Sequence, residues 1–150
     1  MLTCALAERV VNAAKSRATD LGICVNIAVL DAGGHLKAFT RMDRAILASI
    51  DVAIGKARTA VLLETTSEAA WDFCKPGGPA PGLERSNGGL VTFAGGIPIR
   101  GPDQRVIGAV GISGGTVPQD LAIAVAAIAA TDSAVRQPEH QIAIAQQGAE

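Results

Sequence analysis

The sequence is poor in aromatic residues: it has no tyrosine, one tryptophan and three phenylalanines. Proteins that bind single-stranded nucleic acid stack bases on aromatic side chains, and proteins that bind duplexes need a stripe of basic residues. Here the 13 lysines and arginines are scattered along the chain and are offset by 14 acidic residues. We therefore expect no nucleic acid among the partners.

Long apolar runs are also missing. The longest, residues 121–130, is about half of the ~20 residues that a membrane-spanning helix needs. The N-terminus has no basic region, and Glu8 and Arg9 interrupt it before an adequate apolar stretch, so it does not resemble a signal peptide. We expect no membrane as a partner and a cytoplasmic location.

Cysteines are few and widely spaced. Cys4, Cys24 and Cys74 are an odd number, and no two of them form a CxxC motif. This pattern fits neither a disulfide framework nor a zinc or redox motif. The sequence predicts three buried, reduced thiols.

Charged residues are scarce as well, at 18% of the chain against 49% hydrophobic residues. A chain of 150 residues fits one domain, covering residues 1–150, with a single core. A small monomer has too little interior to hide this much apolar surface. We therefore expect a homo-oligomer.

The order of predicted elements favours an α+β fold: two antiparallel hairpins joined in one sheet and covered by helices. Helical spacing predicts helices over residues 3–20, 45–64, 66–73 and 117–135, and strand patterns with turns predict hairpins over 24–42 and 95–113. The glycine- and proline-rich loop 74–89 is long enough to suggest a functional or interface role. Residues 136–150 are expected to be a flexible tail or to dock on a neighbouring subunit.

Local signals refine these elements. Pro98 cannot donate to a strand ladder, so its strand should lie at an edge of the sheet or begin at this residue. Thr116 and Gln119 have the spacing of a capping box at a helix start. The nearby glycines 108, 111, 114 and 115 are explained by close packing and a turn, and carboxylate binding by the amides of Gly115 and Thr116 is the alternative.

Two long segments carry a family resemblance: "VLDAGGHLKAFTRMDRAILASIDVAIGKARTA" and "FAGGIPIRGPDQRVIGAVGISGGTVPQDLAIAVAA". Together they resemble the GlcG/HbpS-like heme-binding family, which also occurs as the C-terminal domain of PduO proteins and was long a domain of unknown function. The resemblance implies a profilin-like antiparallel sheet of about five strands flanked by helices, in dimers or larger homo-oligomers. It also implies heme as a ligand of some members.

Heme iron needs a histidine, methionine, cysteine or tyrosine ligand, so His35, Met42, His140 and the cysteines are the candidates. No CxxCH motif is present, which excludes covalent attachment. His35 is the best candidate because it occupies the histidine position of the family's DAGGH motif. We expect a ligand site beside the first hairpin and under loop 74–89.

A different hypothesis needs no cofactor. In it, six polar residues line a cleft for a small oxygenated organic acid: Asp31, His35, Arg41, Asp43, Lys56 and Glu84. A histidine beside a carboxylate, such as His35 with Asp31 or Asp43, is a general acid/base pair, and Arg41 or Lys56 would hold the substrate's negative charge. This chemistry suits an isomerase, lyase or hydrolase.

The same residues also have purely structural explanations. Asp31 then bonds the amides of its turn, His35 ends the strand, and Arg41 pairs with Asp43 on the surface. No metal-ligand spacing stands out, so no metal site other than heme iron is predicted. All three interpretations of the first hairpin remain open from the sequence.

Overall fold

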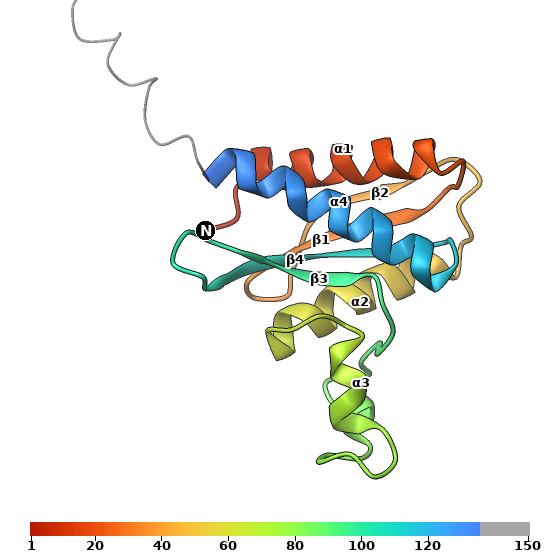
Figure 1. Ribbon diagram of the computed structural model, residues 1–150, viewed down its shortest axis with the longest axis vertical. Coiled ribbons are helices and arrows are strands. Elements are labelled where there is room, and N and C mark those ends of the chain that lie inside the picture. The colour runs from red at the N-terminus through yellow and green to blue at the C-terminus, as the bar shows by residue number, and fades with distance from the viewer. Residues whose placement is uncertain (136–150) are drawn as a thin grey trace, which may run out of the picture.

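A four-stranded antiparallel sheet forms the centre of the computed structural model, which describes residues 1–135 (Figure 1). Its strands are β1 (Asn26–Asp31), β2 (Leu36–Arg41), β3 (Gly96–Arg100) and β4 (Val106–Ser113), in the order β2-β1-β4-β3. The two predicted hairpins therefore join through β1 and β4. The sheet has one strand fewer than the five or so that the family resemblance implied.

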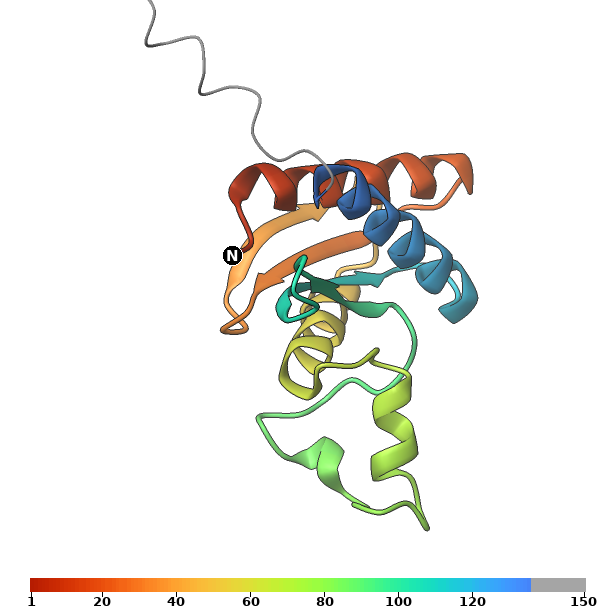
Figure 2. The same ribbon diagram turned by 60° about the vertical axis from the view of Figure 1, so that its left-hand side comes forward.

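Helices cover both faces of this sheet. Helices α1 (Cys4–Asp20) and α4 (Val117–Val135) pack together on one face, and α2 (Ser49–Leu63) lies on the other. The short helix α3 (Ala69–Cys74) and the 3-10 helix η1 (Leu83–Arg85) form a lobe that extends beyond α2 (Figure 2). The architecture is α+β, as predicted.

The larger part of the core lies between the sheet and helices α1 and α4, where Val10, Ile27, Val110 and Ile123 are completely buried. The other face is packed more closely because α2 rests directly on β4. A Cβ atom at Gly111 would collide with the carbonyl oxygen of Ala53. Close packing thus explains this glycine.

An extra residue in β2 changes which side chains share a face. Val29 pairs with Ala38, but the next residue, Leu30, pairs with Leu36, so Lys37 forms a bulge. A strict two-residue alternation along β2 would put Leu36 and Ala38 on one face, and the bulge breaks this alternation. Leu36 stands opposite Leu30 on the α2 face, whereas Ala38 packs against the core under α1.

Several local signals are confirmed. Pro98 lies in the middle of the edge strand β3. The amide of Thr116 donates to Gln119 Oε1 at 2.9 Å, and the amide of Gln119 donates to Thr116 Oγ1 at 3.4 Å. This is the predicted capping box at the start of α4.

The cysteine prediction holds only in part. All three thiols are free, but Cys4 is exposed, Cys24 is half-buried and only Cys74 is buried. Cys4 is the first residue of helix α1 and lies on its exposed side. Burial of all three thiols is therefore wrong.

Residues 1–135 contain no helix that is both long and apolar enough to cross a membrane. In the same part of the chain, no group of three or more metal-ligating side chains comes together. The predicted tail over 136–150 lies outside the described residues, and so does His140.

Candidate functional site

The "DAGGH" stretch forms a tight turn between β1 and β2 that is held by Asp31. One oxygen of this carboxylate, Oδ1, accepts hydrogen bonds from the backbone amides of Gly33 (2.9 Å) and His35 (3.0 Å). These bonds, above all the one from His35, hold the pKa of Asp31 below its usual value of 3.8. Gly34 has a φ of 79°, which favours glycine. The structural explanation of Asp31 is thus confirmed.

His35 lies at the surface beside this carboxylate. Its Nδ1 atom is 3.5 Å from Asp31 Oδ1, and the imidazole is 83% exposed. A Cβ atom at Gly33 would approach Nδ1 to 2.8 Å, so the glycine leaves room for the ring next to Asp31. The ring is oriented by its neighbour yet open to a ligand.

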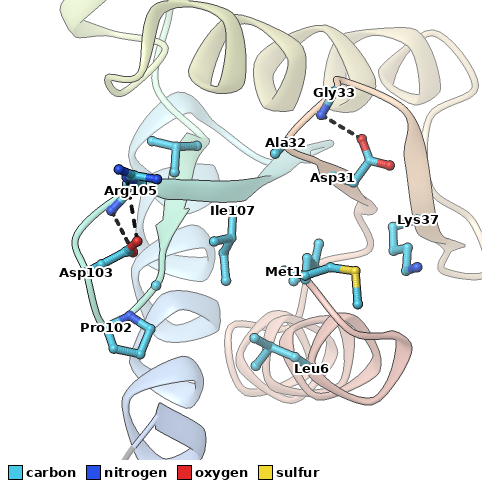
Figure 3. Close-up of a pocket in the computed structure, with 13 residues that line it drawn as sticks. Met1, Leu6, Asp31, Ala32, Gly33, Lys37, Pro102, Asp103, Arg105 and Ile107 are labelled. Atoms are coloured by element: carbon cyan, nitrogen blue, oxygen red, sulfur yellow. Dashed lines mark hydrogen bonds and ion pairs between the residues drawn. The ribbon is translucent and has the colours of Figure 1, made fainter.

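A large cleft opens next to the turn, with a volume of about 930 Å³. Its lining comes from three separate parts of the chain: the N-terminal segment with the first turn of α1, the β1–β2 hairpin, and the β3–β4 hairpin (Figure 3). The lining is mainly apolar, through Leu2, Leu6, Pro102, Val106 and Ile107 among others. Four charged residues edge it: Asp31, Lys37, Asp103 and Arg105.

Arg41 and Asp43 do not belong to this cleft. The register pairs Arg41 with Asn26 at the start of β1, whereas the turn with His35 follows the end of β1. Six residues of extended strand separate His35 from Arg41 by about 20 Å. The two residues share a strand but lie at its opposite ends. Within residues 1–135 no ion pair links Arg41 to Asp43.

Lys56 is buried inside the protein, which contradicts its predicted place in the cleft. Its Nζ atom lies 2.8 Å from Asp120 Oδ2 and donates to the carbonyl oxygen of Ile112 at 2.8 Å. Its side chain has no exposed surface, and burial lowers the pKa of Lys56 and raises that of Asp120. The ammonium group also lies 4.8 Å from the centre of the Phe93 ring. A substrate in a surface cleft therefore cannot reach this ammonium group.

Glu84 lies in the α3–η1 lobe and lines a different, smaller pocket with Trp71 and Cys74. Its Oε2 atom is buried without a hydrogen-bond partner among the described residues. The sequence analysis expected loop 74–89 to cover the cleft beside the first hairpin, and this was wrong, because no residue of the loop lines the cleft. The loop folds onto α3 instead, where the amide of Ala80 donates to the carbonyl oxygen of Phe73.

Three other residues that the sequence suggested for ligand binding are engaged in contacts within the protein. The half-buried Met42 packs against the main core. The amide of Gly115 donates to Asp120 Oδ1 at 2.9 Å, and that of Thr116 donates to Gln119. Side chains of α4 thus occupy the amides that carboxylate binding would require.

Sequence reasoning missed the β3–β4 turn as part of the site. Its "GPDQR" residues were predicted only as a turn, yet Pro102, Asp103 and Arg105 line the cleft. The one available signal was a pair of opposite charges at the tip of an otherwise apolar hairpin. No sequence signal indicated Leu2 and Leu6 as site residues either, because apolar side chains are ordinary at the start of a helix.

Comparison with known proteins adds a consistent set of relatives. A family model described as "Haem degrading protein HbpS-like" matches residues 2–129. A Citrobacter freundii protein, described as an uncharacterized 15.0 kDa protein in the dhaT-dhaS intergenic region, is 37% identical over 85% of this chain and 89% of its own length.

Two solved structures share the fold. The Klebsiella pneumoniae protein ORFY superposes with a TM-score of 0.84 at 34% identity, covering 88% of this chain and 91% of that one. A PduOC–heme complex superposes with a TM-score of 0.81 at 39% identity, covering 86% of this chain and 94% of that one. The second of these proteins was solved with heme bound.

Proposed function

Because the chain belongs to the HbpS-like family, we propose that it is a small-ligand-binding protein whose ligand is heme, held in the cleft beside the first hairpin. The observation that carries this proposal is the cleft itself. Its volume of about 930 Å³ falls in the range of small-molecule sites, which are lined mainly by apolar groups with a few polar ones. The heme-bound state of the similar PduOC protein supports the same ligand.

The residues of the cleft fit a flat apolar molecule without aromatic stacking. Leu2 precedes helix α1 and Leu6 lies in its first turn, whereas Val106 and Ile107 come from the start of β4. Burying apolar surface against such side chains contributes roughly 25 cal/mol per Å². The binding energy would come mainly from this contact, which explains how a chain with so few aromatic residues can hold a large planar ligand.

His35 is the candidate iron ligand. The contact with Asp31 favours a proton on Nδ1, which leaves the lone pair of Nε2 for a metal. Heme, when bound, supplies a redox-active iron to the site. The chain's own contribution is an exposed imidazole on the β1–β2 turn; His35 does not itself line the cleft, but Asp31, Ala32 and Gly33 of the same turn do.

Self-association is the second part of the proposal. Apolar side chains are strongly exposed on the lobe and near the start of α2, including Trp71 (45%), Phe73 (49%) and Leu47 (66%). Burial of such side chains in a contact between copies would remove apolar surface from water. Sedimentation of the purified protein should give more than one chain per particle, and a monomer at micromolar concentration would refute this part.

A titration with hemin tests the ligand. We expect saturation at one heme per chain with a shifted Soret band, and His35→Ala should change the band position and weaken binding about tenfold. The matched control is His140→Ala, because His140 is the other histidine of the sequence. A spectrum that never saturates would refute heme binding, and an effect of His140→Ala alone would refute His35 as the ligand.

The contact between His35 and Asp31 also supports a second candidate, a cofactor-free acid/base enzyme acting on a small organic acid. Here His35 would move the proton, Asp31 would orient the ring, and Lys37 would take the place of Arg41 and Lys56 in holding the anion. Heme-free protein should then turn over hydroxy or keto acids, and His35→Ala should abolish this. Absence of turnover across a broad panel would refute the candidate.

A further inference from the structure

An apolar segment follows the last helix in the sequence. Residues 142–145 read IAIA and lie beyond the region that the HbpS-like family model matches, residues 2–129. Pro138 separates this segment from α4, because proline does not continue a helix. Ile142 and Ile144 are two positions apart, a spacing that puts both on one face of an extended chain. Such a face favours an apolar surface that removes it from water.

Helix α4 ends on the side of the molecule where the cleft opens. Arg9 Nη2 donates to the carbonyl oxygen of Ala130 at 3.3 Å, so the C-terminal turns of α4 lie against the first turns of α1. Leu6, about one turn before Arg9, lines the cleft. Figure 1 shows that α4 runs toward the end of the molecule at which α1 begins. The chain therefore leaves α4 near the cleft.

The connection between α4 and this segment is long enough for docking within one chain. Residues 136–141 span up to about 20 Å when extended. This exceeds the ~10–12 Å width of a helix such as α1, which the chain would have to pass. A tether this short gives a local concentration on the order of millimolar. Docking within one chain is therefore favoured over docking between chains at micromolar protein.

The cleft suits the segment better than the apolar side chains exposed elsewhere. Its lining is mainly apolar, and Leu2 and Leu6 of this lining lie at the end of the molecule that α4 approaches. The exposed side chains of Trp71 and Phe73 belong to the α3–η1 lobe, which extends beyond α2. Because α2 and α4 cover opposite faces of the sheet, the sheet separates the end of α4 from the lobe.

Charge also favours an encounter between the two. Residues 137–150 contain two acids, Glu139 and Glu150, and neither lysine nor arginine. The cleft is edged by the exposed cations Lys37 and Arg105. Its two acids accept hydrogen bonds from backbone amides of their own turns. Opposite charges steer an acidic segment toward such a surface.

We propose that the side chains of Ile142 and Ile144 dock on the apolar lining of the cleft in the same chain, and that they compete there with the ligand. The competition rests on the proposed function, whereas the docking does not. A segment that occupies the cleft in about nine of ten molecules weakens the apparent affinity for a ligand about tenfold. The chain thus regulates access to its own site.

The full chain carrying Ile142→Asn and Ile144→Asn provides the test. In NMR spectra of the ligand-free protein, the amide signals of residues 31–37 and 101–107, which contribute to the cleft lining, should shift from their wild-type positions, because water replaces the isoleucines. Amide signals of the lobe should stay in place. Hemin should bind this double variant about five to ten times more tightly than the wild type.

A matched control introduces the same residue type one position away. Ala143→Asn with Ala145→Asn changes the opposite face of an extended segment, so hemin affinity should stay within about twofold of the wild type and the cleft signals should not shift. The core described above is built from residues 1–135, so thermal unfolding of both double variants should match the wild type.

The outcomes distinguish docking from the heme function. Cleft signals that do not move in the isoleucine variant overturn the docking, whether or not hemin binds. Signals that move while hemin binds neither protein leave the docking in place and overturn the heme function. An unchanged hemin affinity beside shifted signals overturns the competition, and an equal effect of the alanine control overturns the assigned face. Signals that move toward those of the variant when the wild type is diluted overturn docking within one chain.

Discussion

At one end of the sheet Lys56 and Asp120 lie within the protein, and at the other end Lys37 and Asp31 lie at its surface. The buried pair joins α2 to the start of α4, with the carbonyl oxygen of Ile112 as an additional acceptor. The surface pair makes no mutual contact within the described residues, and Asp31 bonds only its own turn. The buried charges, at what we call the closed end of the sheet, join parts of the fold. The surface charges, at the open end beside the cleft, are available for a ligand.

The largest change in stability is expected when one charge of the buried pair at the closed end is removed. Lys56→Met should lower the free energy of unfolding by about 3–5 kcal/mol, because it leaves Asp120 buried without its partner. Lys37→Met at the open end should change it by less than about 0.5 kcal/mol. Urea denaturation of both variants measures the difference.

The double variant Lys56→Met/Asp120→Asn serves as the control. Asparagine keeps an oxygen for the amide of Gly115 but carries no charge, so stability should recover by at least half of the loss. Equal losses for Lys56→Met and Lys37→Met would contradict the distinction between the two ends.

Alanine substitutions at two glycines should show the same contrast between the interior and the cleft, with smaller losses of stability. Gly111→Ala places a methyl group against the carbonyl oxygen of Ala53 in α2 and should cost about 1–3 kcal/mol. Gly101→Ala, in the turn that lines the cleft, would meet side-chain atoms of Asp103 and Ile107 at 3.2 Å, and the carbonyl oxygen of Arg105 only at 3.9 Å. We expect its cost to be below about 1 kcal/mol. Thermal melting curves compare the two, and a larger loss for Gly101→Ala would be inconsistent with this packing.

Buried and exposed cysteines should differ in reactivity. Burial raises the pKa of the Cys74 thiol, and the nearby Glu84 raises it further, so the reactive thiolate is both rare and inaccessible. Cys4 is exposed. Single-cysteine variants treated with a disulfide reagent should react at least tenfold faster at Cys4 than at Cys74, and the reverse order would argue against a buried Cys74.

The smallest expected effect concerns Asp31. Its folded-state pKa is lowered, so its stabilising contribution is complete above the usual value of 3.8 and is lost as the pH falls through the folded value. Asp31→Asn should therefore be less stable than the wild type at about pH 7, and the gap should close as the pH falls through the lowered folded-state pKa of Asp31. Urea midpoints at several pH values test this, and a gap that widens in acid would contradict the sign.

Local structure could be predicted from the sequence because its causes lie within a few residues. The Thr116–Gln119 capping box, the edge position of Pro98 and the turn at Gly34 depend on short-range geometry alone. The site could not be predicted in the same way. Its lining meets only after residues 1–6, 31–37 and 101–107 have folded together.

The misplaced candidates have equally physical reasons. Helical spacing put Lys56 at the edge of an apolar stripe, and only a partner 64 positions away, Asp120, makes its burial favourable. Two-residue alternation in a regular strand would put His35 and Arg41 on one face, but it gives no information on their distance along the strand. A bulge at Lys37 further broke the alternation on which that inference depended.

Pro98 sits at the centre of the outer strand β3, whose register pairs it with Ala109 of β4. Proline has no amide hydrogen, so the outward edge of β3 lacks a donor at its midpoint. A second sheet cannot extend this one across that edge with a complete set of hydrogen bonds, which protects the folded chain from runaway strand-to-strand aggregation. Pairing of strands between copies is therefore disfavoured at β3, whereas the other edge strand, β2, has no proline and keeps all of its amide donors.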